Sequence, residues 1–371
     1  MIRYTLLVDA RARRGAVVLG MVVMLGAGSL VGARAAGPLP VLTGPPLVGP
    51  THLSLVVGDN RSPPFILDVD SQTVRALPSL GIPARPTLWS PQLSLTLTAG
   101  RALAVVTHQA CAHCAISQTN FLIGADGSVQ RSTTLTLTRH EYTTPAFGST
   151  RTWVLTWPHG GGCTLRLVPG ARRAVGVPCG TPGSDTASGL WLGTGHSEML
   201  LDPLTGRIRE RVPVTGRRFD PLHGDLALES IGSSDPTDLT LVNLATGSRK
   251  RLTWPSILHF SYQVFAEPNG PLVAVWFGDP AYPGPAQAVD VWLLDTTTGK
   301  FSHVPGFPAQ QDIKFSHIAW TSDHRLVVVS QSGEGTRTVL GVWTPGQGTL
   351  PVLSVPTHAG GGYYQFVPLT G

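Results

Sequence analysis

Short runs of apolar residues, each ending at turn-forming residues, succeed one another along this chain. In the clearest example, residues 289–294 (VDVWLL) are rich in β-branched and large apolar side chains, and residues 295–299 (DTTTG) follow them. Aspartate can accept a hydrogen bond from the backbone two residues further on, and glycine adopts the positive φ that closes a hairpin. Residues 288–306 are therefore predicted to form a strand, a turn and a second strand.

Variants of this strand–turn unit recur along the chain. The residue after each apolar run serves as an anchor, and the anchors are Asp68, Gly124, Pro169, Asp202, Asn243, Asp295 and Thr344. They span 276 residues in six intervals, a mean of 46. A period of about 40–50 residues that contains only strands indicates propeller blades. We therefore expect an all-β chain, a β-propeller of seven four-stranded blades, with six or eight blades or a β-sandwich as alternatives.

A second element, an apolar strand entered from a polar turn, precedes most of these units. Examples begin at Leu97, Phe219, Ala266 and Trp320. Residues 320–325 (WTSDHR), together with residues 202–206 and 295–299, resemble the W-S-P-D-G and hydrophobic-D-x-x-T-G elements of TolB-like, WD-repeat-like β-propellers. The resemblance spans about residues 51–371, with residues 150–179 and the start of the fourth predicted blade departing most, and it implies a fold rather than a chemistry.

The two ends of the repeat complement each other. Residues 362–371 are predicted to form an innermost strand with nothing after it, and residues 51–57 the next strand with no inner strand before it. A first blade built from both ends would remove the exposed strand edges, so we expect a ring closed in this way.

Residues 1–36 are predicted to be a separate targeting segment. Arginines precede an uncharged run at residues 15–33, and an A-x-A sequence follows at residues 33–35. This pattern is typical of a secretory signal, although an uncharged run of 19 residues is also long enough for a membrane anchor. Residues 37–50, rich in proline and glycine, are expected to form a linker, and residues 51–371 the propeller.

The basic character of the chain belongs to that targeting segment. Residues 1–36 hold five arginines and one aspartate, so they carry +4 of the formal +5 and leave +1 for the rest. A nearly neutral propeller offers no basic surface for nucleic acid, and we expect none as a partner.

The four cysteines are expected to form disulfides, which are the default in an exported chain. Cys163 and Cys179 flank a predicted hairpin whose midpoint falls in the turn, so they should face each other. Cys111 and Cys114 form a C-x-x-C sequence beside His108 and His113. A short-loop disulfide is the favoured interpretation, and a zinc or copper site is the alternative.

Binding residues are expected in the connections between second and third strands and between blades, because these connections share one rim. The candidates are Arg61, His108, His113, His140, Glu141, Tyr142, His159, Asp235, Asp238, Asp279 and Tyr282. The tryptophans (Trp153, Trp157, Trp191, Trp254, Trp276, Trp292 and Trp343) are expected to pack between blades instead.

These patterns together predict an exported or membrane-anchored, non-enzymatic propeller that binds a protein or cell-envelope component through its loops. We expect a monomer without a cofactor, with membrane contact only through residues 15–33 if they remain uncleaved. No G-x-S-x-G or phosphate-binding sequence is present. The alternatives are a propeller hydrolase or lyase acting on a glycan or peptide, and a metal-handling protein built on the C-x-x-C loop.

Overall fold

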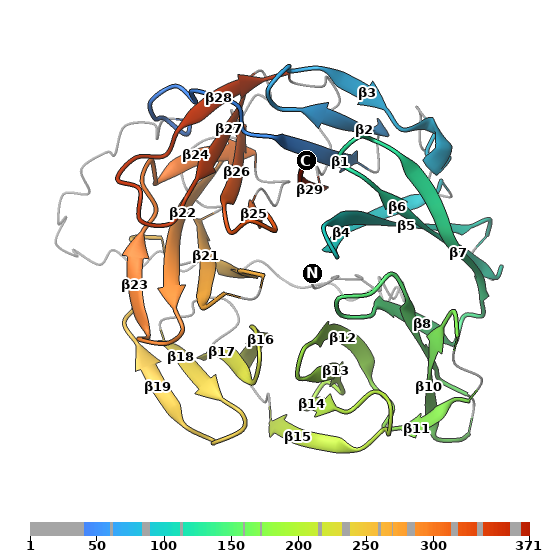
Figure 1. Ribbon diagram of the computed structural model, residues 1–371. Helices are drawn as coiled ribbons and strands as arrows, with labels where there is room; N and C mark the ends of the chain where they lie inside the picture. Colours follow the sequence, from blue (N-terminus) through green and yellow to red (C-terminus); the bar gives the residue numbers. More distant parts are fainter. Residues whose placement is uncertain are drawn as a thin grey trace, which may run out of the picture. The chain divides into compact units, whose positions relative to one another are not determined.

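Seven antiparallel sheets follow one another around a central axis in the computed structural model (Figure 1). The structure describes residues 41–59, 62–83, 90–111, 114–158, 160–170, 173–213, 217–231, 238–258, 261–268, 270–279, 286–312, 318–331, 337–356 and 365–371. The expectation of a seven-bladed β-propeller is confirmed. Among the described residues, no helix is long and apolar enough to cross a membrane.

In each blade the chain runs from the innermost strand outward, except that blade one takes its innermost strand from the C-terminal end. Blade one contains β29 (Gln365–Thr370), β1 (Leu53–Asp59), β2 (Ser62–Asp68) and β3 (Val74–Ala76), followed by the 3-10 turn η1 (Pro78–Leu80). Blade two contains β4 (Gln92–Thr98), β5 (Arg101–Gln109), β6 (Ile116–Ile123) and β7 (Val129–Leu137). Blade three contains β8 (Glu141–Pro145), β9 (Thr152–Thr156), β10 (Cys163–Val168) and β11 (Val175–Val177). Blade four contains β12 (Thr181–Thr186), β13 (Gly189–Gly193), β14 (Ser197–Leu201) and β15 (Ile208–Pro213).

The remaining three blades follow the same order. Blade five contains β16 (Arg217–Pro221), β17 (Leu226–Ile231), β18 (Asp238–Asn243) and β19 (Arg249–Leu252). Blade six contains β20 (Ser261–Ala266), β21 (Leu272–Asp279), β22 (Ala286–Asp295) and β23 (Lys300–His303), with the short β24 (Ala309–Asp312) also paired to β22. Blade seven contains β25 (Ile318–Trp320), β26 (Leu326–Gln331), β27 (Thr338–Trp343) and β28 (Val352–Val355).

The ring closes through its two ends, as the sequence predicts. Strand β29 is the inner strand of blade one and pairs antiparallel with β1 over six positions, from Leu53 opposite Thr370 to Gly58 opposite Gln365 (Figure 1). The first and last strands of the described propeller therefore shield each other's edges.

Every blade turns from its third to its fourth strand through a residue with positive φ. Six of these residues are glycines, including Gly299 at φ +63°, and blade one uses Gln72 at φ +55°. The anchor side chain fixes the same turn: Asp295 Oδ1 accepts the Thr297 N–H at 2.8 Å, and Asp202 Oδ1 accepts the Leu204 N–H at 2.9 Å. This local chemistry is why the repeat is visible in the sequence.

Apolar side chains fill six of the seven seams between neighbouring blades in the described part of the ring. The largest of these clusters joins blades six and seven and includes Trp276, Val291, Leu326 and Trp343. The others join blades one and two, three and four, four and five, five and six, and seven and one. Burying each large apolar side chain contributes roughly 1.5–3 kcal/mol, so these seams supply most of the driving force for closure.

The seam between blades two and three is different, because a chain of polar side chains runs through it. Thr143 donates a hydrogen bond to Gln118 at 2.6 Å, Gln118 donates to Asn120 at 3.0 Å, and Asn120 donates to Thr152 at 2.7 Å. Gln118, Asn120 and Thr152 are each 1% exposed. The amides satisfy one another across the seam, which makes their burial tolerable.

The segment 41–50, expected as a linker, lies against blades six and seven. Val352 on the outer strand of blade seven donates its N–H to Pro45 O at 2.8 Å and accepts the Leu47 N–H at 2.9 Å. Leu42 is 1% exposed and belongs to the apolar cluster between blades six and seven. A Cβ on Gly44 would lie 1.8 Å from Leu350 O, so only glycine fits there. This segment therefore adds backbone pairing and apolar contact to the outer edge of blade seven.

Candidate functional site

One end of the propeller carries both kinds of connection in which binding residues are expected. In an antiparallel blade, the link between the second and third strands and the link to the next blade lie at the same end, which we call the loop face. The opposite end, the turn face, carries the other two connections of each blade. Six of the eleven candidate residues are described: His108, His140, Glu141, Tyr142, Asp238 and Asp279. Arg61, His113, His159, Asp235 and Tyr282 lie outside the described residues.

The structure brings three of the six described candidates together, at the loop-face end of blade three. His140, Glu141 and Tyr142 lie at the start of the inner strand β8. His108 is on blade two, Asp238 on blade five and Asp279 on blade six. Asp238 forms an ion pair with Arg251 of its own blade. The candidates therefore do not form one site, and only the blade-three group is a local cluster.

Glu141 is the partly buried hydrogen-bond acceptor of this cluster. Its carboxylate accepts the Thr138 N–H at 2.8 Å and an Arg166 N–H at 3.1 Å. Burial acts to raise the pKa of Glu141, but these hydrogen bonds outweigh it, so the pKa lies below its ordinary value. The Glu141 side chain is 11% exposed, whereas that of Arg166 is 38% exposed. Glu141 is thus an ionised structural acceptor, and it leaves the Arg166 guanidinium partly accessible.

Two aromatic rings lie exposed beside this ion pair. Tyr142 is 42% exposed and Trp157, immediately after β9, is 39% exposed. Their ring centroids are 6.3 Å apart with the planes tilted by 58°. The backbone N–H of Trp157 donates to the backbone carbonyl of His140 at 2.7 Å, which holds the end of β9 against the start of β8.

Trp157 is a site residue for which the prediction from sequence is wrong. The pattern predicts that it packs between blades, as Trp153, Trp191, Trp276 and Trp343 do with 2–6% exposure. Trp157 lies one position beyond the last residue of its strand and so escapes the seam. Its position in the sequence, shortly before the glycine-rich loop 160–162, is the feature that could have indicated an exposed tryptophan.

A second polar cluster lies between blades five and six. Arg218 forms two hydrogen bonds with Asp220, at 2.8 and 3.2 Å, and its guanidinium carbon lies 4.3 Å from the centroid of the Tyr262 ring. Tyr262 is fully buried, and its hydroxyl donates to Ser230 at 3.0 Å. Burial, reinforced by nearby Asp220, raises the pKa of Tyr262 far above its ordinary value. These groups satisfy one another and link the two blades.

Glu198, on the third strand of blade four, has the most unusual proton affinity among the described carboxyl groups. Burial, with a smaller contribution from the charge of Asp220, raises the pKa of Glu198 to about 7. It lies opposite Gly193, where a Cβ would come within 2.9 Å of its carboxylate. The sequence contains no signal for it, because Glu198 looks like an ordinary polar residue before an apolar run.

Both disulfides form in the structure. Cys163 is bonded to Cys179, and Cys111 is bonded to Cys114. Sulfur atoms joined in this way are not available as thiolate ligands. Within the described part of the chain, no group of three or more histidine, cysteine or carboxylate side chains converges as a metal site would require.

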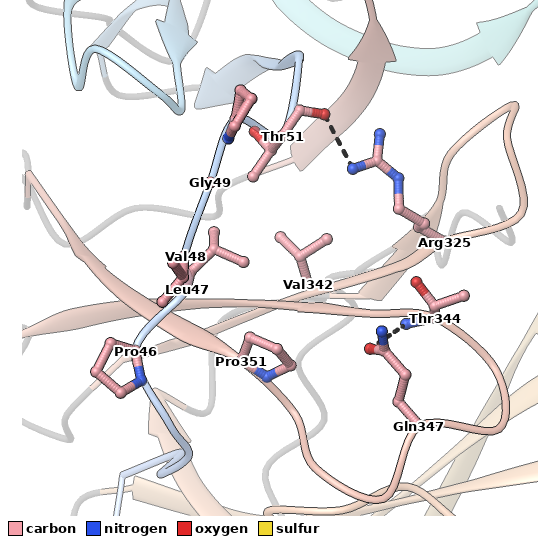
Figure 2. Close-up of a pocket in the computed structure, with 11 residues that line it drawn as sticks. Pro46, Leu47, Val48, Gly49, Thr51, Arg325, Val342, Thr344, Gln347 and Pro351 are labelled. Atoms are coloured by element: carbon pink, nitrogen blue, oxygen red, sulfur yellow. Dashed lines mark hydrogen bonds between the residues drawn. The ribbon is translucent and has the colours of Figure 1, made fainter.

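A shallow cavity of about 270 Å³ lies between the segment 46–51 and blade seven (Figure 2). Arg325 points across it toward Thr51, whose carbonyl accepts a guanidinium N–H at 2.9 Å. Arg325 also pairs with Asp323 at 2.8 Å, so its charge is already compensated. Proline, valine and threonine make up much of the remaining lining, and none of the described lining residues is a carboxylate or an imidazole. We assign this cavity to the packing of the N-terminal segment.

Comparison with known proteins identifies the fold but no family. No family model matches the sequence, and no curated protein matches it significantly. A prolyl endopeptidase structure is 13% identical with a TM-score of 0.52, covering 86% of this chain and 51% of that chain. This chain therefore corresponds to about half of that enzyme.

Two further solved structures superpose less closely. The periplasmic gluconolactonase of Pseudomonas aeruginosa is 13% identical with a TM-score of 0.48, covering 85% of this chain and 99% of that chain. The propeller domain of the trilobed protease of Pyrococcus furiosus is 9% identical with a TM-score of 0.47, covering 76% and 96%. At such low identity a likeness carries fold alone. The chain is a seven-bladed β-propeller, and its activity has to be argued from its own residues.

Proposed function

We propose that this chain is an extracytoplasmic, non-enzymatic β-propeller of the TolB-like kind that binds a protein partner through its loop face. Tyr142 and Trp157 anchor that partner. The observation that carries the proposal is the exposure of these two adjacent rings, 42% and 39%, at the ends of paired strands. Tyrosine and tryptophan are enriched among the residues that dominate protein–protein binding energy, because they bury a large area with little loss of side-chain entropy.

The surroundings of the two rings suit a binding surface. The rings project from β8 and from the end of β9, which pair over five positions, so the backbone beneath them is fixed before binding. The half-exposed guanidinium of Arg166 lies at the edge of this cluster and offers donors to a carbonyl or carboxylate of the partner. An aromatic centre with a polar rim is the usual anatomy of an interface.

The cysteines and the N-terminus support the proposed extracytoplasmic compartment. Two disulfides are typical of proteins in oxidising, extracytoplasmic compartments. We propose that residues 1–36 export the chain, as a cleaved signal or a membrane anchor. They precede a connecting segment at 37–50, whose described part packs on blades six and seven, and a monomeric propeller at 51–371. The net charge of +1 outside residues 1–36 supports a protein partner rather than nucleic acid.

Binding is favoured over hydrolysis by where the perturbed carboxyl groups lie. Burial raises the pKa of both Glu198 and Asp185. Asp185 is near the turn-face end of β12, where it accepts the Phe147 N–H at 2.8 Å and the Trp153 indole N–H at 2.7 Å. Glu198 is at the loop-face end of a different strand. The two carboxyls therefore do not face one another as a general acid and base would.

Site-directed photocrosslinking in the cells that make the protein tests the proposal. A crosslinking residue replaces Trp157 in one variant and Phe147 in another. Phe147 is the matched control, because it is 54% exposed on the turn face of the same blade. We expect a discrete protein adduct from position 157 that is absent from position 147.

The protein in that adduct is then purified and its affinity measured by calorimetry. Tyr142→Ala combined with Trp157→Ala should weaken binding by about 30-fold or more, the effect of losing roughly 2 kcal/mol at an interface anchor. Phe147→Ala should leave the affinity unchanged. Equal adducts from both positions, or full affinity in the double variant, would contradict the proposal.

A further inference from the structure

The two disulfides lie in opposite environments. Cys163 is 1% exposed and, with the partly buried Cys179, packs in the apolar cluster between blades three and four. Cys111 is exposed and Cys114 is half-buried, and neither belongs to an apolar cluster of the described residues. In the first of these bonds Cys163 is shielded inside the seam and Cys179 is partly buried, whereas in the second Cys111 is exposed at the loop face.

The exposed disulfide is also redundant for holding its strands together. Strands β5 and β6 pair without a break through eight positions, ending with Gln109 opposite Ile116. Beyond that pair, the Cys114 N–H donates to Cys111 O at 3.1 Å, and the side-chain amide of Gln109 donates to Cys114 O at 3.1 Å. These hydrogen bonds therefore hold the two ends of this connection together without any contribution from the disulfide.

The number of residues between the bonded cysteines also indicates that Cys111–Cys114 contributes less to stability than Cys163–Cys179. The Cys111–Cys114 bond joins residues three apart, and the Cys163–Cys179 bond joins residues 16 apart. A disulfide stabilises chiefly by restricting the unfolded chain, and this restriction grows with the length of the closed loop. The shorter, exposed bond is thus the one whose loss the fold tolerates best, and accessible disulfides are typically the exchangeable ones.

We propose that Cys111–Cys114 is an exchangeable redox site on the loop face, whose co-reactant is a thiol, while Cys163–Cys179 is a permanent structural bond. A thiolate attacks Sγ of Cys111, the more exposed sulfur. The Cys111–Cys114 bond breaks, a mixed disulfide forms on Cys111, and the electron pair leaves on Cys114, which takes a proton from water. A second thiolate then attacks the outer sulfur of the mixed disulfide and releases Cys111 as a thiol. One disulfide and two thiols thus give two cysteine thiols and one external disulfide.

The test uses the purified full chain under native conditions. Reduced glutathione and a purified C-x-x-C dithiol protein, thioredoxin, are each applied at matched thiol concentration. Samples are quenched with N-ethylmaleimide at intervals, and the labelled cysteines are identified by peptide mass spectrometry. We expect Cys111 and Cys114 to become labelled at least 100-fold faster than Cys163 and Cys179. Faster reduction by thioredoxin identifies a protein dithiol as the co-reactant class, and faster reduction by glutathione identifies a small thiol.

Two single variants test the order of attack. With oxidised glutathione in place of reduced glutathione, the free Cys111 thiolate in Cys114→Ser should attack the glutathione disulfide, release one reduced glutathione and keep the other as a stable adduct. This adduct should form at least tenfold faster than the corresponding adduct on Cys114 in Cys111→Ser. The double variant Cys111→Ser, Cys114→Ser should keep the native circular dichroism spectrum. Reduction of both disulfides with one half-time, or reduction of Cys111–Cys114 only as fast as the chain unfolds, would overturn the proposal.

Discussion

The side-chain amide of Asn120 on blade two donates a 2.7 Å hydrogen bond to the hydroxyl of Thr152 on blade three, with both residues 1% exposed. This contact lies in the polar seam between blades two and three. The apolar cluster on the blade-two side of this seam is small and contains only Leu103, Val105 and Leu122 among the described residues. Other seams of the ring are held by apolar packing, so this one depends most on hydrogen bonding.

Asn120→Ala should lower the free energy of unfolding by about 2 kcal/mol, because it leaves Gln118 and Thr152 buried with unmet hydrogen bonds. Urea denaturation followed by tryptophan fluorescence measures the change. Thr119→Ala, on the opposite face of the same strand, is the matched control and should cost less than half as much. An effect of Asn120→Ala no larger than that of the control would show that the polar seam contributes little.

Leu42→Ala should destabilise the propeller by about 2–4 kcal/mol, because it empties a fully buried position between blades six and seven. Val48→Ala is the control from the same segment, since Val48 is 88% exposed, and it should change stability by less than about 0.5 kcal/mol. Both are measured by chemical denaturation. Similar stabilities for the two variants would mean that the segment 41–50 does not hold the blades together in solution.

Glu198→Gln should stabilise the protein above neutral pH and have little effect in acid. The ordinary pKa of this group is 4.5, and burial raises it to about 7 in the folded chain, so the folded state binds the proton more tightly. The stability that protonation provides is complete below about pH 4.5 and is lost as the pH rises through 7. A glutamine side chain at this position cannot ionise and escapes this loss.

Because Glu198 is partly exposed to solvent, water weakens the effect of its charge. We therefore expect Glu198→Gln to raise the free energy of unfolding at pH 8 by about 1 kcal/mol, or Tm by roughly 2 °C. Thermal melts at pH 4.5 and pH 8 measure it, with Glu210→Gln on the neighbouring strand as the control. An equal shift in Tm at both pH values would rule out the proton linkage.

Deleting residues 365–371 should abolish cooperative unfolding, because blade one then loses its inner strand and β1 loses six backbone-paired positions. Circular dichroism melts and gel filtration check this outcome. Removal of Gly371 alone, which lies beyond β29, should leave both measurements nearly unchanged. A truncated chain that melts as sharply as the full chain would contradict closure through β29.

Features that are local and repeated can be predicted from the amino-acid sequence alone. Asp202, Asp295 and the glycines of the third-to-fourth strand turns act within one hairpin, so a spacing of about 46 residues is enough to predict blades. The bond between Cys163 and Cys179 follows from the same logic, because a hairpin midpoint determines which residues face each other. The complementary ends predict the pairing of β29 with β1.

Features that arise between blades and between faces depend on the folded ring. Trp157 and Tyr142 are 15 positions apart, and whether a ring enters a seam or stays exposed depends on where its strand ends. The raised pKa of Glu198 depends on burial and on Asp220 of the next blade. Leu42 looks like part of a proline-rich linker until the groove that receives it exists. Period and turn chemistry are short-range properties of the chain, whereas burial is set by packing partners that the spacing of the repeats does not encode.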